Sequence, residues 1–205
     1  MTEGAALQGR DLAVWRGERR VLEGLSFELR SGELGLLVGP NGSGKTTLLR
    51  VLAGLASPTA GLATWNGTAI GELPPEQRGD LAYRGHLEAL KRDLTVRENL
   101  QFHASLFGVS RLLGPVLAEL ALEEAADTRV RYLSAGQKRR AALASLQLSG
   151  AKLWLLDEPT TNLDREGRAL LRDWTDRHLA AGGLAMIATH QPDELGRSGA
   201  LVIEL

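Results

Sequence analysis

Residues 39–46 carry the most specific chemical signal in the sequence, because they match G-x-x-x-x-G-K-[ST] in full. Such a loop wraps phosphate oxygens in backbone N–H groups, and side chains would obstruct that path, which explains glycine at positions 39, 42 and 44. Lys45 would supply charge to the β- and γ-phosphates, and Thr46 would offer its hydroxyl to Mg²⁺. The predicted nucleotide-binding residues are Gly39, Pro40, Asn41, Gly42, Ser43, Gly44, Lys45, Thr46 and Thr47.

The position of this loop favours binding over an inert turn. A glycine-rich turn that binds nothing is the alternative interpretation. The loop follows an apolar run and precedes a helix predicted over residues 45–53, whose positive end would point at the same anion. We therefore expect the chain to bind a nucleoside triphosphate.

A second candidate site is the acidic pair Asp157-Glu158, which follows the apolar run Leu153–Leu156. Successive residues of a strand point in opposite directions, so the two carboxylates would do different jobs. Asp157 would face Mg²⁺, directly or through water, and Glu158 would reach the water that attacks the γ-phosphate. On its own the pair could equally cap the next helix. Beside a complete phosphate loop, the catalytic interpretation is favoured.

The run Leu133-Ser134-Ala135-Gly136-Gln137 brings a hydroxyl, a glycine and an amide to a predicted helix start. A helix start of this kind can bind an anion without a lysine. The five residues fit an ordinary capped helix equally well. Taken alone, they leave both interpretations open.

Three apolar runs would position these groups: Leu34–Val38, Leu153–Leu156 and Leu184–Ala188. Each ends at a polar cluster, and the runs are separated by helical patterns. This arrangement predicts a parallel sheet that is covered on both faces. Ligands bind at the carboxyl ends of the strands in such sheets, so we expect the polar clusters to meet there.

The remaining segments predict two additions to this α/β core. Short alternating segments at Leu12–Trp15, Leu25–Leu29 and Leu62–Trp65 indicate a flanking antiparallel sheet. The pattern becomes helical after Thr95-Val96-Arg97-Glu98, which fits a capping box. We expect one domain over residues 1–205: a P-loop NTPase core with a mostly parallel sheet, an antiparallel β subdomain, and a helical subdomain inserted at residues 87–140.

The composition excludes several classes of function. Hydrophobic residues make up 43% of the 205 residues and charged residues 24%, so the chain is neither disordered nor collagen-like. A net charge of -1 provides no bulk attraction to nucleic acid or to an anionic membrane. Without cysteine there is no disulfide, thiolate metal site or cysteine nucleophile. We expect neither a signal peptide nor a membrane-spanning helix, which needs about 20 apolar residues.

Taken in order along the chain, the motifs resemble those of the ATP-binding cassette ATPases. The resemblance implies that Ser134, Ala135, Gly136 and Gln137 form a signature that contacts the γ-phosphate held by the other subunit of a homodimer. Ala135 stands where that family usually has a second glycine. Thr161-Asn162-Leu163-Asp164 matches the family's D-loop at the dimer seam, which assigns Asp164 to the nucleotide site.

Three further residues acquire roles from this resemblance. His190 matches the family's switch histidine and would act in catalysis with Glu158; considered alone, it would be a structural loop histidine. Trp15 lies about where an aromatic residue stacks on adenine, although core packing is an alternative. His86 lies where the family has a glutamine that touches Mg²⁺. A neutral imidazole is a poor ligand for that hard cation, and a surface loop histidine is the alternative.

The Gly85-His86 pair also narrows the resemblance to the ATPase subunits of cytochrome c maturation systems, which are heme exporters. The other similar segments are Leu133–Gln137 followed by Arg139-Arg140, Trp65-Asn66-Gly67, Leu94–Leu100 and Thr189-His190-Gln191-Pro192. The resemblance implies ATP and Mg²⁺ as cofactors, integral membrane permease subunits as partners, and a peripheral place on the cytoplasmic face of a bacterial inner membrane.

Other functions stay open from the sequence. The chain could be the ATPase subunit of another transporter of the family, or a nucleotide-gated interaction module that does not hydrolyse ATP. The presence of Glu158 and His190 disfavours the module. We expect no nucleic acid partner, because the chain has neither coiled-coil heptads nor a dominant basic patch. We also expect no direct heme binding, because the chain has no heme attachment motif and no cysteine.

Overall fold

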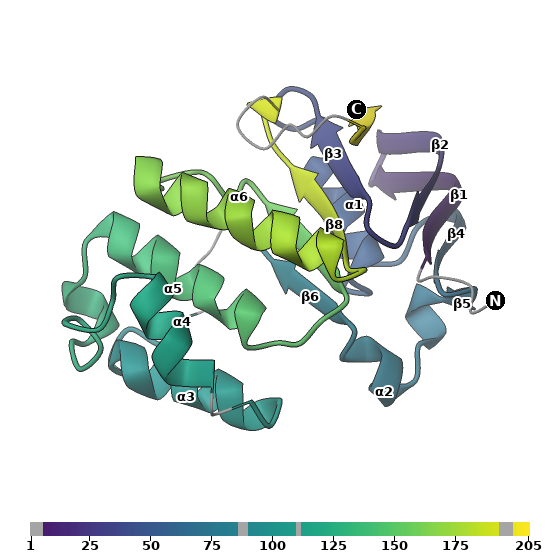
Figure 1. The fold of residues 1–205 in the computed structure, drawn as a ribbon. Coiled ribbons are helices and arrows are strands. Elements are labelled where there is room, and N and C mark those ends of the chain that lie inside the picture. Colours follow the sequence, from purple (N-terminus) through teal and green to yellow (C-terminus); the bar gives the residue numbers. More distant parts are fainter. Residues whose placement is uncertain (1–5, 86–89, 110–111, 193–198) are drawn as a thin grey trace.

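A five-stranded parallel sheet forms the centre of the molecule in the computed structural model, which describes residues 6–85, 90–109, 112–192 and 199–205 (Figure 1). The strands run in the order β6-β7-β8-β3-β9. Their bounds are β3 Leu34–Val38, β6 Leu81–Arg84, β7 Leu153–Asp157, β8 Leu184–Ala188 and β9 Leu201–Glu204. The parallel sheet predicted from the apolar runs is confirmed.

This sheet is buried on both faces because successive strand residues enter different cores. Leu153 and Leu155 pack with the helix α1 (Lys45–Leu52) and with the second sheet. Trp154 and Leu156 point to the other side, where they pack with α6 (Arg165–Ala180) and the remaining helices. The alternation explains why the strands are continuous apolar runs rather than alternating patterns.

The predicted antiparallel sheet is also confirmed and is longer than its sequence signal. It contains β1 (Ala6–Arg16), β2 (Arg19–Arg30), β4 (Ala60–Trp65) and β5 (Thr68–Ala69), in the order β2-β1-β4-β5. Asn66 and Gly67 join β4 to β5 and both have positive φ, 51° and 80°, as a two-residue hairpin turn of type I′ requires. This sheet lies beside the parallel one in Figure 1.

Helices α3 (Val96–Leu106), α4 (Leu113–Glu119) and α5 (Ala135–Gln147) form a group on the other side of the molecule (Figure 1). The short elements η1 (Ile70–Glu72), α2 (Pro75–Arg78) and η3 (Val130–Tyr132) complete the described structure. The predicted capping box at the start of α3 is confirmed, since Thr95 and Glu98 exchange hydrogen bonds of 3.1 and 2.8 Å. Apolar residues of α3, α4 and α5 share one core with the adjacent sheet face.

A half-buried histidine joins the end of α6 to the sheet. The His178 ring stacks on Trp154 with 4.0 Å between ring centroids and 8° between planes. Its Nε2 lies 3.0 Å from the Leu184 carbonyl oxygen. Burial lowers the pKa of His178, although nearby backbone carbonyls oppose this effect. The folded state therefore favours the neutral ring.

This burial predicts that acid destabilises the protein partly through His178. Because its pKa is lower in the folded state than in the unfolded chain, its stabilising contribution is present above the unfolded pKa of about 6.5 and is lost as the pH falls below it. Urea unfolding at pH 7.5 and 5.5 measures the effect. The loss of unfolding free energy between these pH values should be smaller in His178→Phe, which keeps an aromatic ring but cannot be protonated. Equal losses in both proteins would contradict the prediction.

Candidate nucleotide-binding site

The predicted phosphate loop connects the end of β3 to the start of α1, and its backbone requires glycine at two positions. Gly39 has φ 149° and Gly44 has φ 113°. A Cβ on Gly39 would lie 2.4 Å from the Leu205 carbonyl oxygen, and one on Gly44 would lie 2.9 Å from Leu22 Cδ2. The loop is therefore shaped by packing behind it as well as by the space that phosphates would need in front.

Lys45 is the side chain of this loop that is best suited to an anion. The Lys45 side chain is only 7% exposed, and its ammonium donates to the carbonyl oxygens of Gly39 at 2.6 Å and Pro40 at 3.1 Å. The Ser43 hydroxyl is buried without a hydrogen-bond partner among the described atoms. An ammonium has three donors, so a bound phosphate could accept from Lys45. The Ser43 hydroxyl instead lies on the packed side of the loop, 2.9 Å from where a Cβ on Gly39 would be. The loop thus fits the triphosphate expected from its sequence.

Thr46 and Asp157 form the second part of the site. Asp157 ends β7, is 3% exposed, and accepts a hydrogen bond of 2.7 Å from the Thr46 hydroxyl in the first turn of α1. Hydroxyl and carboxylate oxygens are suitable Mg²⁺ ligands. Within the described part of the chain, no group of three or more His, Asp or Glu residues could hold a metal ion. A cation at Thr46 and Asp157 would therefore need further ligands from phosphate and water.

Glu158 and His190 form the third part, at the ends of neighbouring strands. His190 Nδ1 lies 2.8 Å from Glu158 Oε2. Glu158 has φ 49°, a left-handed conformation that costs an ordinary residue roughly 1–2 kcal/mol. Its backbone N–H donates to the Ala188 carbonyl oxygen at 2.9 Å, which fixes it against β8. The turn at Glu158 directs its carboxylate to the histidine, whereas Asp157 faces Thr46.

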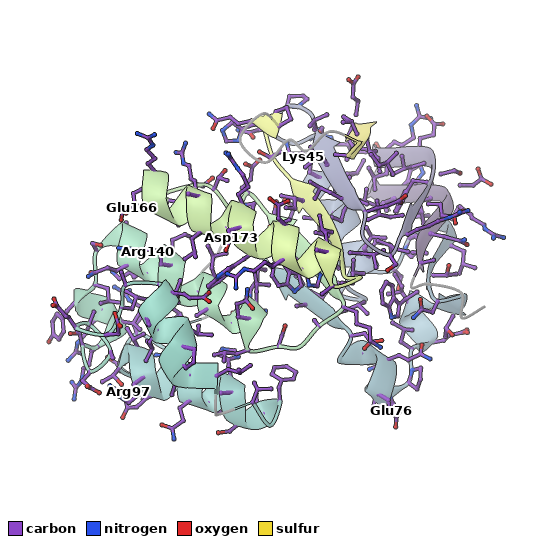
Figure 2. The ribbon with its side chains drawn as sticks, in the orientation of Figure 1. Lys45, Glu76, Arg97, Arg140, Glu166 and Asp173 are labelled. Atoms are coloured by element: carbon purple, nitrogen blue, oxygen red, sulfur yellow. The ribbon has the colours of Figure 1, made fainter. Side chains whose placement is uncertain are left out.

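These groups line one cavity of about 820 Å³, within the usual size range of small-molecule sites. The wall of this cavity brings together the predicted residues Asp157, Glu158 and His190 and most of the predicted loop. Ser43 is not on this wall. Arg19, Val21 and Arg50 also line the cavity and were not predicted as site residues. Thr161, the first residue of the predicted D-loop, lines it too. No motif identifies the two arginines, since they reach the cavity from β2 and from α1 only in the folded chain. In Figure 2 Lys45 lies in the upper middle of the view and Arg97 at the lower left among the helices, so the helical group extends away from this cavity.

The predicted signature does not reach this cavity. Ser134 is the N-cap of α5, and its hydroxyl accepts from the Gln137 N–H at 3.1 Å while the Gln137 side chain accepts from the Ser134 N–H at 3.0 Å. Neither of these residues, nor Ala135 or Gly136 between them, lines the cavity wall. The start of α5 lies beside the predicted D-loop, because a Cβ on Gly136 would be 3.8 Å from the Asn162 carbonyl oxygen.

Asp164 and Trp15, which were also predicted as site residues, lie away from the cavity wall as well. Asp164 is the N-cap of α6, with a 2.8 Å hydrogen bond from the Gly167 N–H, and lies 4.0 Å from Arg140. Trp15, in β1, is 48% exposed, so it is not packed in the core, and it does not line the cavity. His86 lies outside the described residues.

Comparison with known proteins agrees with this geometry. The ABC transporter family model matches residues 22–161. The chain is 48% identical to the cytochrome c biogenesis ATP-binding export protein CcmA of Rhodospirillum rubrum, over 98% of this chain and 86% of the relative. It is 49% identical to the protein of the same name from Ruegeria pomeroyi, over 88% and 82% of the two chains.

Two solved structures share the fold. A putative ABC transporter ATP-binding protein from Pyrococcus furiosus has a TM-score of 0.81 at 27% identity, covering 98% of this chain and 97% of that one. An ATP-binding subunit of an ABC transporter has a TM-score of 0.81 at 29% identity, covering 90% and 79%. The chain therefore belongs to the ABC transporter family of ATP-hydrolysing ATPases and, within it, to the family of the cytochrome c biogenesis ATP-binding export proteins.

Proposed function

We propose that the cavity binds ATP with Mg²⁺ and that the residues around it hydrolyse the γ-phosphate bond. The observation that carries this proposal is the grouping of Lys45, Thr46, Asp157, Glu158 and His190 on the wall of one cavity. Lys45 and the loop N–H groups bind the phosphates, and Glu158 accepts a proton from the attacking water or orients it. His190, hydrogen-bonded to Glu158 through Nδ1, has its other ring nitrogen available for the γ-phosphate or the water.

Thr46 and Asp157 would hold the Mg²⁺ ion. Their 2.7 Å hydrogen bond places two hard oxygen atoms together beside the phosphate loop. A Mg²⁺ ion held there would supply positive charge next to the phosphates, where negative charge develops during transfer. His86 stays a weaker candidate ligand, on the sequence argument alone.

We further propose that two copies of the chain enclose the nucleotides between them. Ser134–Gln137 lie away from the cavity of their own chain, so they are available to that of a second copy. The capping box uses the N–H groups of Ser134 and Gln137, whereas those of Ala135 and Gly136 have no acceptor within the helix. These two groups and the positive end of α5 would contact the γ-phosphate bound by the partner, with Asp164 at the seam. Trp15 remains a candidate for stacking on adenine.

Membership of the ABC family implies a membrane permease as partner. We propose that residues 1–205 form one nucleotide-binding domain, with the inserted helical subdomain at residues 87–140, that drives heme handling in cytochrome c biogenesis. The names of its relatives support this assignment. No helix in the described ranges is long and apolar enough to cross a membrane. The chain would act at the cytoplasmic face of the inner membrane through its permease, without contacting heme or nucleic acid.

Isolation of the partners tests the transport assignment. The tagged chain is purified from detergent-solubilised membranes, and the proteins that accompany it are identified by mass spectrometry. We expect integral membrane proteins of cytochrome c maturation. A permease for an unrelated cargo would contradict the heme assignment and leave only the ABC ATPase assignment. The Lys45→Ala variant is purified in the same way. Partners whose binding depends on nucleotide should be lost from it, and partners that bind without nucleotide should be retained.

Lys45→Ala should weaken ATP binding by roughly 10- to 100-fold, because a hydrogen bond to a charged group contributes about 1.5–3 kcal/mol. Equilibrium titration with ATP measures the change. Lys152→Ala is the matched control, since Lys152 pairs with Asp80 outside the cavity. Unchanged ATP affinity in Lys45→Ala would refute the assignment of the loop.

Glu158→Gln should slow phosphate release by about 10²- to 10⁴-fold, the usual contribution of an acid–base group, while ATP affinity is retained. The variant should also accumulate as a dimer with ATP, which sedimentation in the presence and absence of ATP measures. Glu76→Gln is the control, because Glu76 lies on α2 away from the cavity (Figure 2). Normal turnover in Glu158→Gln would exclude the proposed role of this carboxylate.

A further inference from the structure

Arg139 is a buried arginine on α5 that contacts the backbone at the end of β7. Its side chain is 6% exposed. Its Nη2 donates to the Glu158 carbonyl oxygen at 2.8 Å, and its Nε donates to the Pro159 carbonyl oxygen at 3.3 Å. A guanidinium is rarely buried to this degree unless its donors are used. Its guanidinium donates here to two consecutive peptide carbonyl groups that directly follow β7.

These two peptide groups set the direction of the Glu158 side chain. Glu158 has φ 49°, in the left-handed region that residues other than glycine rarely adopt. Its N–H is fixed to β8 by Ala188, and its carbonyl oxygen accepts from the Thr161 N–H at 3.2 Å as well as from Arg139. A strained conformation persists only where its surroundings determine it. The Arg139 side chain contributes to this by its hydrogen bond to the Glu158 carbonyl oxygen.

We propose that Arg139 is a positioning residue that orients the Glu158 carboxylate for hydrolysis and couples it to α5. Arg139 lies five residues after Ser134, little more than one helical turn from the start of α5. In the proposed dimer, the start of α5 contacts the nucleotide of the partner, whereas Arg139 of the same helix holds Glu158 of its own cavity. One helix therefore connects the two nucleotide sites. This inference depends on the proposed roles of Glu158 and of the dimer.

Arg139→Gln and Arg139→Lys test the positioning role in the full chain, assayed in membranes that contain its permease. In Arg139→Gln we expect kcat to fall by roughly 10- to 100-fold, since displacing a reacting group by about 1 Å can cost 10²-fold. The KM for ATP should stay within about twofold, because the phosphate loop is unchanged. Arg139→Lys should have an intermediate kcat, because an ammonium donates to these carbonyls but lacks the planar fork.

Arg177→Gln is the matched control, because Arg177 pairs with Glu119 and Asp173 on the outside of the molecule. Its kcat and KM should equal those of the wild type. A merely structural role of Arg139 would lower the thermal midpoint and the concentration of active sites, and would spare the turnover of the sites that remain. Active-site titration with a tightly bound ATP analogue distinguishes the two, and normal turnover per folded site would overturn the proposal.

A double-mutant cycle with Glu158→Gln shows whether Arg139 acts through the carboxylate. If it does, Arg139→Gln should cause no further loss of the residual turnover in the Glu158→Gln background. Fully additive losses would overturn the proposal, and the same cycle with Arg139→Lys applies if Arg139→Gln does not fold. Absence of hydrolysis in the wild type would overturn the proposed function together with this inference. Normal wild-type hydrolysis with an unaffected Arg139→Gln would overturn this inference alone.

Discussion

The pairing of β3, β7 and β8 in parallel register is the constraint on which the site depends. Asp157 of β7 pairs with Ala188 of β8, and Ala188 pairs with Leu37 of β3. The backbone hydrogen bonds continue beyond the strands, from the Glu158 N–H to Ala188 and from the Thr189 N–H to Leu37. This register brings the phosphate loop, the acidic pair and His190 to one edge of the sheet. A shift of one residue in any strand would exchange the faces of its side chains and separate these groups.

Electrostatics then gives each group at this edge a separate role. Lys45 is buried and is hydrogen-bonded to neutral carbonyl oxygens, so its charge remains available to an anion. Asp157 is buried beside the Thr46 hydroxyl, and its negative charge also acts within the sheet: burial and this charge together raise the pKa of Tyr83 on β6. Glu158 turns away from Asp157 to His190, which keeps the two carboxylates apart in function. The cavity therefore combines a cationic loop, a candidate cation site and a candidate base.

Much of this arrangement could be predicted from the sequence, because its main elements have local signals. The apolar runs predicted β3, β7 and β8, and the spacing of residues 39–46 predicted the loop between β3 and α1. The full length of β1 could not be predicted, since it pairs with β2 and β4 through several register shifts that only the folded sheet determines. The contact of Arg139 with the backbone of Glu158 could not be predicted either, although Arg139-Arg140 contributed to the family resemblance. Arg139 stands in the charged run Lys138-Arg139-Arg140, a pattern typical of a solvated helix face. It is buried in the folded chain, where it contacts the carbonyl groups of Glu158 and Pro159 after β7.

The start of α5 shows why two interpretations of one motif need not exclude each other. The sequence left open whether Ser134–Gln137 is a helix cap or an anion site. The structure uses the Ser134 hydroxyl and the Gln137 amide in a capping box, so these side chains stabilise the helix. The box occupies the N–H groups of the first and last residues of the motif and leaves the two between them without an acceptor in the helix. Small residues at positions 135 and 136 keep those N–H groups accessible. A cap built in this way prepares the helix start for an anion instead of competing with it.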